Sequence, residues 1–477
     1  MRVVSCPFSD CRQKSCRNQN NNPKREKRRK TMGQLSKFFG LRERKTSVKT
    51  EVIAGLTTFM TMAYVLVVQP SAIVGFGAVP AIVDINGISV SKEAVVVTCA
   101  VISGLITLLM GLYANMPFAL STGMGSNFML GALLQSGSIS FGQIMAVILV
   151  SGLIFLGLSV FGIRDLIVRM IPKNIKLAIG SAIGFFIAYL GFKNTGIGVF
   201  EGGIGLGDFR SPSVILAVVG LLIIAALTAF KVKGAILIGI VATTLLGIPF
   251  GVTTLPTQLF KLPDFSQVGN LCFQFDFSGL FTPAFIVLIF IAFFGDFFST
   301  LGTVLGVAGK AGMLDEDGNL PGIQKPFLVD AIGTCVGALT GCTTITTYVE
   351  SSSGVEAGGR TGLTAVTTAA LFLLSVFAAP LFLMIPDAAT GPALIFVGFL
   401  MMADIGKIDF SNFSEAFGPF VMILFVIFTG SIASGIAAGI LAHVFIKCIT
   451  GRFKEVHPGM YVLCVPLVLY FLYNTPL

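Results

Sequence analysis

Residues 290–360 read FIAFFGDFFSTLGTVLGVAGKAGMLDEDGNLPGIQKPFLVDAIGTCVGALTGCTTITTYVESSSGVEAGGR, and this stretch decides the fold. It places one acid, Asp296, inside an apolar run and a second, Glu350, in a Thr/Ser/Gly-rich segment where a hydrophobic helix breaks. An acid within a membrane span is costly unless it faces a cavity or a partner. Broken helices at membrane depth are tolerated where they line such a cavity. The stretch therefore predicts a membrane transporter whose site surrounds these two acids.

The composition indicates a polytopic helical membrane protein that crosses the lipid bilayer many times. Of the 477 residues, 54% are hydrophobic and 12% are charged, and the mean hydropathy is +0.90. Soluble domains carry about 25% charged residues. The net charge of +9 comes from residues 1–50, which hold 15 Lys or Arg and three acids, whereas the remainder holds 17 and 20. The basic excess is therefore a tail, and no binding of nucleic acid is predicted.

Apolar windows of about 20 residues predict fourteen membrane spans in two halves of seven. The first half consists of 52–74, 94–112, 118–134, 143–163, 175–195, 213–231 and 234–250. The second half consists of 281–305, 328–342, 346–357, 362–386, 390–404, 417–431 and 432–450. With the N terminus inside, the cytoplasmic loops and C-terminal tail carry thirteen Lys or Arg and the opposite side four. This asymmetry follows the positive-inside rule and predicts that both termini are cytoplasmic.

The two ends of the chain are predicted to lie outside the bundle of spans. Residues 1–50 form a basic, partly disordered cytoplasmic tail, and the first 31 have no apolar core of the kind a signal peptide needs. They are interpreted as a disordered tail or as sequence upstream of a start at Met32. The segment that follows Met32 is predicted to be amphipathic and to lie on the inner membrane surface. Residues 451–477 form a tail with an apolar, interfacial segment at 460–473.

Spans three and ten are interrupted at corresponding places in the two halves. Span three contains PFALSTGMGSNFML (117–130), in which small and polar residues interrupt the apolar run. Span ten contains CTTITTYVESSSGVEAGG (342–359), in which β-branched residues precede a Ser/Gly-rich half-helix. Interrupted segments at matching positions are typical of transporter sites built on inverted repeats. We predict a short extended segment in each span and two seven-span repeats of opposite orientation.

The candidate site residues lie at or near these interruptions. Asp296 and Ser299 are one helical turn apart in span eight, so they share a face. Glu350 precedes Ser351 at the break in span ten, and Asn127 has the matching place in span three. Together they suit an uncharged planar ligand with edge N–H and C=O groups, or a cation, accompanied by a proton. The structural alternatives are that each acid bonds neighbouring backbone or hydroxyl groups and that Asn127 makes a plain interhelical hydrogen bond.

Motifs for other chemistry are absent from the sequence. The DEDGNLPG loop at 315–322 lacks the ligand spacing of a calcium loop. No hydrolase, zinc-protease, Walker or paired Cys-x-x-Cys motif is present. We therefore predict no enzymatic activity, catalytic residue, cofactor or metal site, and transport that is facilitated or driven by an ion gradient. A non-transporting sensor or a channel is the alternative from another class.

Five motifs carry a resemblance to a known family: GLTTFMTMAYVLVVQPSAI (55–73), GMGSN (123–127), FFGDFFSTLGTV (293–304), AGMLDEDGNLPGI (311–323) and TTYVESSSGVEAGGRTGLTAV (346–366). They resemble the azaguanine-type purine permeases, the hypoxanthine/guanine/adenine branch of the nucleobase-ascorbate transporter superfamily. The resemblance extends over about residues 34–460. It implies a core domain, residues 51–163 and 281–386, that moves as an elevator against a gate domain, residues 164–250 and 390–450. It also implies proton symport of purine nucleobases across the cytoplasmic membrane, by a homodimer formed through gate contacts.

The resemblance assigns substrate binding to Asn127, Asp296 and Glu350, with Glu350 accepting ring N–H groups. Protonation of Glu350 or Asp296 is then expected to couple transport to the proton gradient. Two departures affect the pocket: Ser299 replaces a second acid of the family, and STGMGSNFML replaces APGMGLNAYF. Loss of an acceptor weakens recognition of a purine amino group. Xanthine or urate is therefore the alternative substrate, and a pyrimidine or an organic anion is a further alternative.

Overall fold

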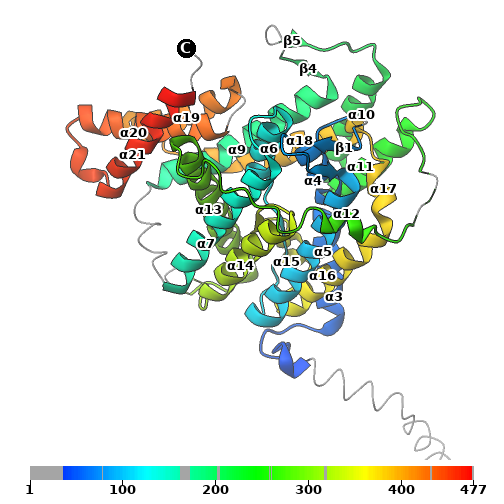
Figure 1. Ribbon diagram of the computed structural model, residues 1–477. Coiled ribbons are helices and arrows are strands. Elements are labelled where there is room, and N and C mark those ends of the chain that lie inside the picture. Colours follow the sequence, from blue (N-terminus) through cyan, green and yellow to red (C-terminus); the bar gives the residue numbers. More distant parts are fainter. Residues whose placement is uncertain are drawn as a thin grey trace, which may run out of the picture.

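The computed structural model describes residues 36–77, 79–161, 172–200, 205–256, 258, 260–315, 320–429 and 432–474. The predictions for residues 1–31 lie outside the described residues. Within the described part, eight helices are long and apolar enough to cross a membrane, and further apolar helices are shorter. The chain is a mostly helical, multi-pass membrane protein, as the sequence predicts (Figure 1). The total of fourteen spans stays a prediction.

The elements follow the predicted spans closely. The first half contains α3 (Val48–Met62), α4 (Val65–Val74), β1 (Ala81–Val83), β2 (Ser89–Ser91), α5 (Lys92–Leu109), the π-helix η1 (Met110–Ala114), β3 (Leu120–Thr122), α6 (Met124–Gln135), α7 (Phe141–Phe161), α9 (Lys173–Thr195), β4 (Gly198–Val199), β5 (Gly205–Leu206), α10 (Pro212–Ala229) and α11 (Ala235–Gly247). The second half contains α12 (Phe265–Gly269), α13 (Pro283–Ala311), α14 (Gln324–Thr340), β6 (Ile345–Thr347), α15 (Ser351–Glu356), α16 (Gly362–Ser375), α17 (Ala379–Leu383), α18 (Asp387–Met401), α19 (Phe413–Thr429), α20 (Ile432–Ile449) and α21 (Pro458–Asn474). The short extended segments predicted for spans three and ten are confirmed as β3 and β6.

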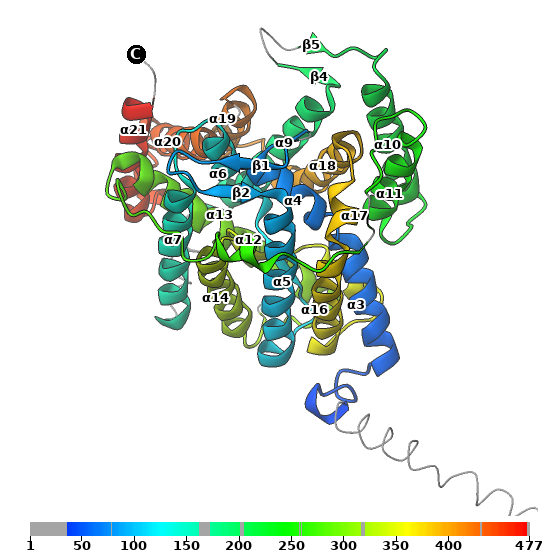
Figure 2. The same ribbon diagram turned by 45° about the vertical axis from the view of Figure 1, so that its right-hand side comes forward.

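The helices pack in two groups. In the first group α5 packs against α16 and α14 packs against α7, while α3 packs against α16 and α13 against α7. The first and second spans of each half thus pack against the fourth span of the other half, and this reciprocity indicates that the two halves are related repeats. In the second group α9 and α18 pack together, with α10 and α11 on one side and α19 and α20 on the other (Figures 1 and 2). The roles of these groups as core and gate stay predictions.

Both ends of the described chain pack against the helix bundle. Near the N terminus, Phe39 and Leu41 are buried and lie in a cluster with Leu363 at the start of α16. These two side chains therefore face protein and not the membrane surface, whereas Phe38 is exposed. At the C terminus, the apolar segment 460–473 lies within α21, which packs against α13 and α20. Sequence alone does not distinguish an apolar face toward lipid from one toward protein.

The closest crossing of α4 and α6 leads to a prediction about Gly131. A Cβ at this position would lie 2.0 Å from the carbonyl oxygen of Ala72, which belongs to the backbone and cannot rotate away. We expect Gly131→Ala to destabilise the protein by about 1–3 kcal/mol, the usual cost of overpacking. Gly157→Ala in α7 is the control, because a Cβ there meets no atom within 4 Å. Thermal unfolding of the purified variants measures the difference, and equal unfolding temperatures would contradict the prediction.

Candidate functional site

The site is organised by two short strands, β3 and β6, that meet as a pair between the helices of the first group. This pair is called the strand crossing below, because each strand belongs to a different half of the chain. Strands β3 and β6 pair antiparallel, with Leu120 opposite Thr347, Ser121 opposite Thr346 and Thr122 opposite Ile345. Each strand then leads toward a helix, α6 or α15. Because these segments come from spans three and ten, the crossing joins the two halves of the chain.

Two threonines hold the strands in equivalent ways. The hydroxyl of Thr107 in α5 accepts a hydrogen bond from the N–H of Leu120 at 2.9 Å and donates to its carbonyl at 3.0 Å. The hydroxyl of Thr334 in α14 accepts from the N–H of Ile345 at 3.3 Å and donates to its carbonyl at 2.9 Å. Spans two and nine thus satisfy the backbone groups that a short strand leaves unpaired, at positions where an unpaired group is costly.

Glu350 lies half-buried at the junction between β6 and α15. The hydroxyl of Tyr64, between α3 and α4, donates to Glu350 Oε1 at 2.8 Å. The adjacent Ser351 connects spans three and ten, because its hydroxyl accepts a hydrogen bond from the N–H of Ala119 at 3.0 Å. The structure therefore gives Ser351 a bond that stabilises the crossing, and its predicted contact with substrate stays a prediction.

Asn127 is fully buried in α6, and both ends of its amide group are bonded within the protein. Its Nδ2 donates to Gln69 Oε1 at 3.0 Å, and its Oδ1 accepts from the Thr344 hydroxyl at 3.1 Å. Gln69 in turn donates to the Thr343 hydroxyl at 3.1 Å. These bonds favour the alternative in which Asn127 makes an interhelical hydrogen bond. Each end of the amide has capacity for one more hydrogen bond, because the nitrogen carries two protons and the oxygen two lone pairs.

Asp296 and Ser299 share a helix but differ in environment. Asp296 is 6% exposed, and its Oδ2 accepts a hydrogen bond from the Thr334 hydroxyl at 2.7 Å. Its other oxygen, Oδ1, is buried and has no hydrogen-bond partner among the described residues. Ser299 is exposed. The structure thus places Asp296 against β6 and α14, and it leaves Ser299 at the surface of the helix group.

A further acid at this site, Asp330 in α14, was not predicted from the sequence. Its side chain is fully buried, and its two oxygens accept hydrogen bonds from Thr300 at 2.8 Å and Thr347 at 2.9 Å. The signal was present, because Asp330 lies in the apolar run 328–342 just as Asp296 lies in its own. In the described part of the chain, the bonded network of Asp296 and Asp330 is separate from the bond between Glu350 and Tyr64.

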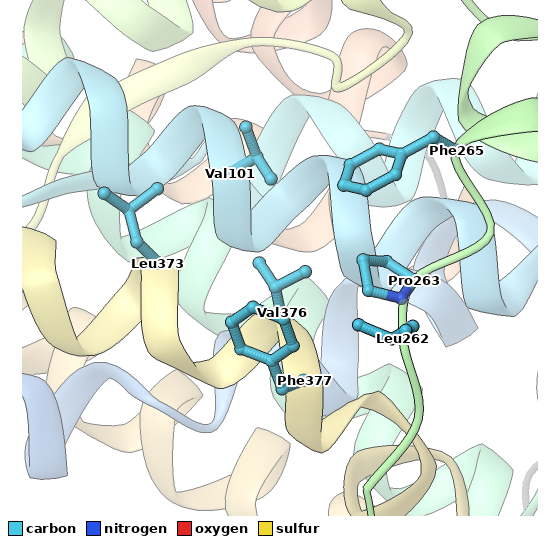
Figure 3. Close-up of a pocket in the computed structure, with 7 residues that line it drawn as sticks. All are labelled: Val101, Leu262, Pro263, Phe265, Leu373, Val376 and Phe377. Atoms are coloured by element: carbon cyan, nitrogen blue, oxygen red, sulfur yellow. The ribbon is translucent and has the colours of Figure 1, made fainter.

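A pocket of about 400 Å³ elsewhere on the first group has a different character. It lies between α5, the end of α16 and the segment before α12, and it is lined by Val101, Leu262, Pro263, Phe265, Leu373, Val376 and Phe377 (Figure 3). These side chains offer neither hydrogen-bond donors nor acceptors. Recognition of a polar planar ligand requires such groups, so this pocket does not suit one.

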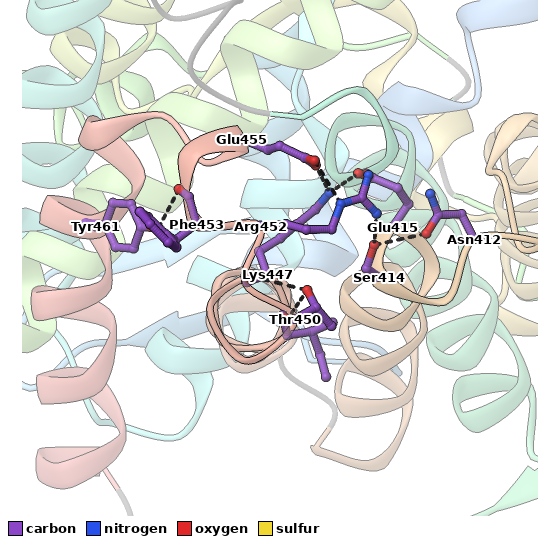
Figure 4. Close-up of polar contacts among 10 residues, drawn as sticks. Asn412, Ser414, Glu415, Lys447, Thr450, Arg452, Phe453, Glu455 and Tyr461 are labelled. Carbon is purple, nitrogen blue, oxygen red and sulfur yellow. Dashed lines mark hydrogen bonds and ion pairs between the residues drawn. The ribbon is translucent and has the colours of Figure 1, made fainter.

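Charged residues also gather where α19, α20 and the turn before α21 meet. The buried Lys447 contacts Glu415 and donates to Glu455 at 2.7 Å, while Arg452 donates to Glu455 at 2.8 Å and to the Ser414 hydroxyl at 2.9 Å (Figure 4). Hydrogen bonds from Lys447 and Arg452 hold the pKa of Glu455 below its ordinary value. The cluster pairs its charges internally and so stabilises the turn into α21.

Comparison with known proteins places the chain in a family. The model of the Permease family matches residues 49–438. The chain belongs to this permease family. A putative permease, MJ0326 of Methanocaldococcus jannaschii, is 40% identical to this chain, and the match covers 92% of this chain and 98% of the relative. The guanine/hypoxanthine permease PbuG of Bacillus subtilis is 36% identical over 92% of this chain and 100% of the relative. The adenine permease AdeQ of Escherichia coli is 35% identical, over 91% and 94% respectively.

Solved structures confirm the fold of this permease. The transmembrane domain of the cyanobacterial bicarbonate transporter BicA has a TM-score of 0.58 at 15% identity, covering 82% of this chain and 97% of that one. Murine Slc26a9, an anion transporter in the inward-facing state, has a TM-score of 0.57 at 12% identity, covering 85% and 68%. The family match and the curated relatives, and not these structures, confirm the resemblance of the sequence to a permease family and show that the chain is a transporter and not an enzyme.

Proposed function

We propose that this permease takes up purine nucleobases, such as hypoxanthine, guanine and adenine, across the cytoplasmic membrane by proton symport. The names of two relatives that match nearly all of the chain, a guanine/hypoxanthine permease and an adenine permease, support the substrate class. The observation that carries the proposal is the position of Glu350, half-buried where β6 leads toward α15 and held by Tyr64. A carboxylate accepts hydrogen bonds only, so it suits the N–H groups along the edge of a purine ring.

The proposed site also includes Asn127, Asp296, Ser299 and Ser351. Glu350 and Asp296 are the proposed proton-coupling groups, because an acid at membrane depth is less costly to move when it carries a proton. The free Oδ1 of Asp296 supports this role, since it has capacity for a proton or a ligand atom that the described residues do not use.

Alternating access is proposed to come from movement of the core domain, 51–163 and 281–386, against the gate domain, 164–250 and 390–450. The division follows the two packing groups, because the strand crossing and both acids lie in one group while α9 and α18 centre the other. Both termini are proposed to be cytoplasmic, and a homodimer through the gate is expected.

Uptake by cells that lack their own nucleobase permeases tests the function. We expect saturable uptake of labelled hypoxanthine that guanine and adenine compete and that a protonophore abolishes. Cells carrying the empty vector are the control, and xanthine, urate and uracil are the further competitors. Competition mainly by xanthine or urate would replace the proposed substrate by the oxidised purines. Absence of saturable uptake of any of these compounds would overturn the function.

A further inference from the structure

A second pocket of about 400 Å³ lies on the predicted cytoplasmic side of the first helix group. It lies between the segment before α3, the end of α13 and the loop that joins α15 to α16. The described residues that line it include three basic residues and one acid, together with apolar side chains such as Met116 and Met313. The charged residues are Glu43, Arg44, Lys45 and Arg360. This pocket, called the basic pocket below, therefore offers the hydrogen-bond donors that the apolar pocket lacks.

Backbone groups fix the position of Arg44 in the basic pocket. Its Nη1 donates to the carbonyl of Asn115 at 3.0 Å and to that of Arg360 at 2.7 Å. Asn115 in turn donates through Nδ2 to the carbonyl of Phe39 at 3.3 Å and accepts from the N–H of Gly362 at 2.8 Å. These bonds tie the segment before α3 to the end of span two and the start of span eleven. The guanidinium group of Arg44 thus has a defined place beside Arg360.

Arg360 is held in the same way and also keeps unused donors. Its Nη1 donates to the carbonyls of Val355 at 2.6 Å and Gly359 at 2.7 Å. In the part of the chain that the structure describes, no ion pair includes Arg44, Lys45 or Arg360. A guanidinium group carries five N–H donors, and each arginine uses only Nη1 in its hydrogen bonds to described residues. The Nε and Nη2 donors of both arginines are therefore open to an anion.

The acids near the two arginines do not neutralise the basic pocket. Glu43 lines the pocket, but its side chain is exposed. Glu51 lies close enough to act on Arg44, but its carboxylate accepts backbone N–H groups at the start of α16. Partial burial lowers the pKa of Arg44 from its ordinary value and outweighs the opposite effects of Glu51 and Glu43. A half-buried cation without a paired acid is stabilised when an anion binds against it.

The size and the apolar wall of the basic pocket indicate a ligand larger than a simple anion. Small-molecule sites measure about 300–1,000 Å³ and combine apolar walls with a few polar groups that fix orientation. Arginine binds phosphate groups through two parallel N–H donors. Met116 is buried and Met313 is half-buried, and methionine makes favourable contacts with aromatic rings. The pocket therefore combines donors for a phosphate group with a wall for a ring.

We propose that the basic pocket binds a phosphate ester such as a nucleoside monophosphate, with its phosphate group on Arg44 and Arg360. The rest of the ligand packs against Met116 and Met313, and the exposed Lys45 supplies a further positive charge. The headgroup of a phospholipid presents the same phosphate chemistry, so the test includes both sources. The inference does not depend on the purine substrate proposed above, because the basic pocket is separate from the strand crossing.

Calorimetry of the purified full-length protein with guanosine monophosphate tests the proposal, because this probe carries both a phosphate group and a planar ring. We expect Arg44→Gln to weaken binding about tenfold or more, the effect of losing hydrogen bonds to a charged group. This variant also loses bonds within the protein. Lys45→Gln does not, since the Lys45 side chain is exposed and bonds no described residue, and about a threefold loss is expected. Lys49→Gln, an exposed lysine outside the pocket, is the matched control and should bind as wild type.

Two further variants locate the bound probe. Glu43→Gln removes the acid that lines the basic pocket and should tighten binding about threefold, because a repulsive charge is lost. Glu350→Gln changes the proposed transport site and should bind guanosine monophosphate as wild type does. Loss of binding in Glu350→Gln, with no change in Glu43→Gln, would place the probe at the transport site and overturn the proposal.

Nanodiscs of phosphatidylcholine, with and without phosphatidylglycerol, distinguish a soluble ligand from a lipid. Equal binding of guanosine monophosphate in both discs supports a soluble phosphate ester. The lipid source is supported if phosphatidylglycerol abolishes this binding and native mass spectrometry finds that lipid on wild type but not on Arg44→Gln or Lys45→Gln. Absence of both ligands from wild type, or equal binding by wild type, Lys45→Gln and Glu43→Gln, would overturn the proposal.

Discussion

Replacing Glu350 with Gln is expected to reduce hypoxanthine uptake by about a hundredfold or more. The substitution keeps the size of the side chain, and its amide oxygen still accepts the bond that Tyr64 now donates at 2.8 Å. It removes the charge that accepts ring N–H groups and the proton that the acid carries. Two hydrogen bonds to a charged group contribute about 1.5–3 kcal/mol each, so loss of both accounts for an effect of this size.

Two controls separate the role of Glu350 from a general effect on the protein. Glu356→Gln, six residues on, changes an exposed acid whose ion pair with Lys310 lies at the surface. Surface ion pairs contribute little, so uptake by this variant should equal that of wild type. Tyr64→Phe leaves the acid but removes its donor, and about a tenfold loss is expected. Initial rates are compared at equal amounts of protein in the membrane, and a Glu350→Gln rate within twofold of wild type would contradict the assignment.

The strand crossing could be predicted from the sequence because its signals are local. β-branched residues next to a Ser/Gly-rich half-helix indicate an extended segment, and the matching interruption in span three indicates its partner. The register that places Ser121 opposite Thr346 is not local. It depends on Thr107 and Thr334, which lie on other helices and bond the strands across the fold.

The environment of each acid could be predicted only in part. Asp296 and Asp330 both follow the rule that an acid in an apolar run marks a polar partner, but the sequence does not show that the two lie on facing helices. The exposure of Ser299 could not be predicted, because residues three apart on a helix point about 60° apart. At the border of a packed surface, that angle is enough to bury one side chain and expose the other.

The second large effect is expected at Glu51, a residue with a structural role. Its carboxylate is fully buried at the start of α16, where it accepts hydrogen bonds from the N–H groups of Arg360 at 2.9 Å, Thr361 at 3.2 Å and Thr364 at 3.2 Å. The hydroxyl of Thr364 adds a fourth bond at 2.6 Å. A negative charge at a helix N terminus is favourable, because the first N–H groups lack the usual partner within the helix; the N–H of Thr364 also donates to the carbonyl of Thr361 at 3.2 Å. Glu51 thus fastens α3 in span one to α16 in span eleven.

We expect Glu51→Ala to destabilise the protein by about 3–5 kcal/mol, because it leaves several buried donors without an acceptor. Glu93→Ala is the matched control, since Glu93 also lies in the first turn of a membrane helix but pairs with Lys261 near the surface. Thermal unfolding in detergent should show a large fall in the unfolding temperature for the first variant and almost none for the second.

The Glu51→Ala protein that survives purification should bind hypoxanthine with unchanged affinity, because Glu51 fixes the helix and does not reach the strand crossing. An unfolding temperature equal to that of Glu93→Ala would show that other groups satisfy the start of α16.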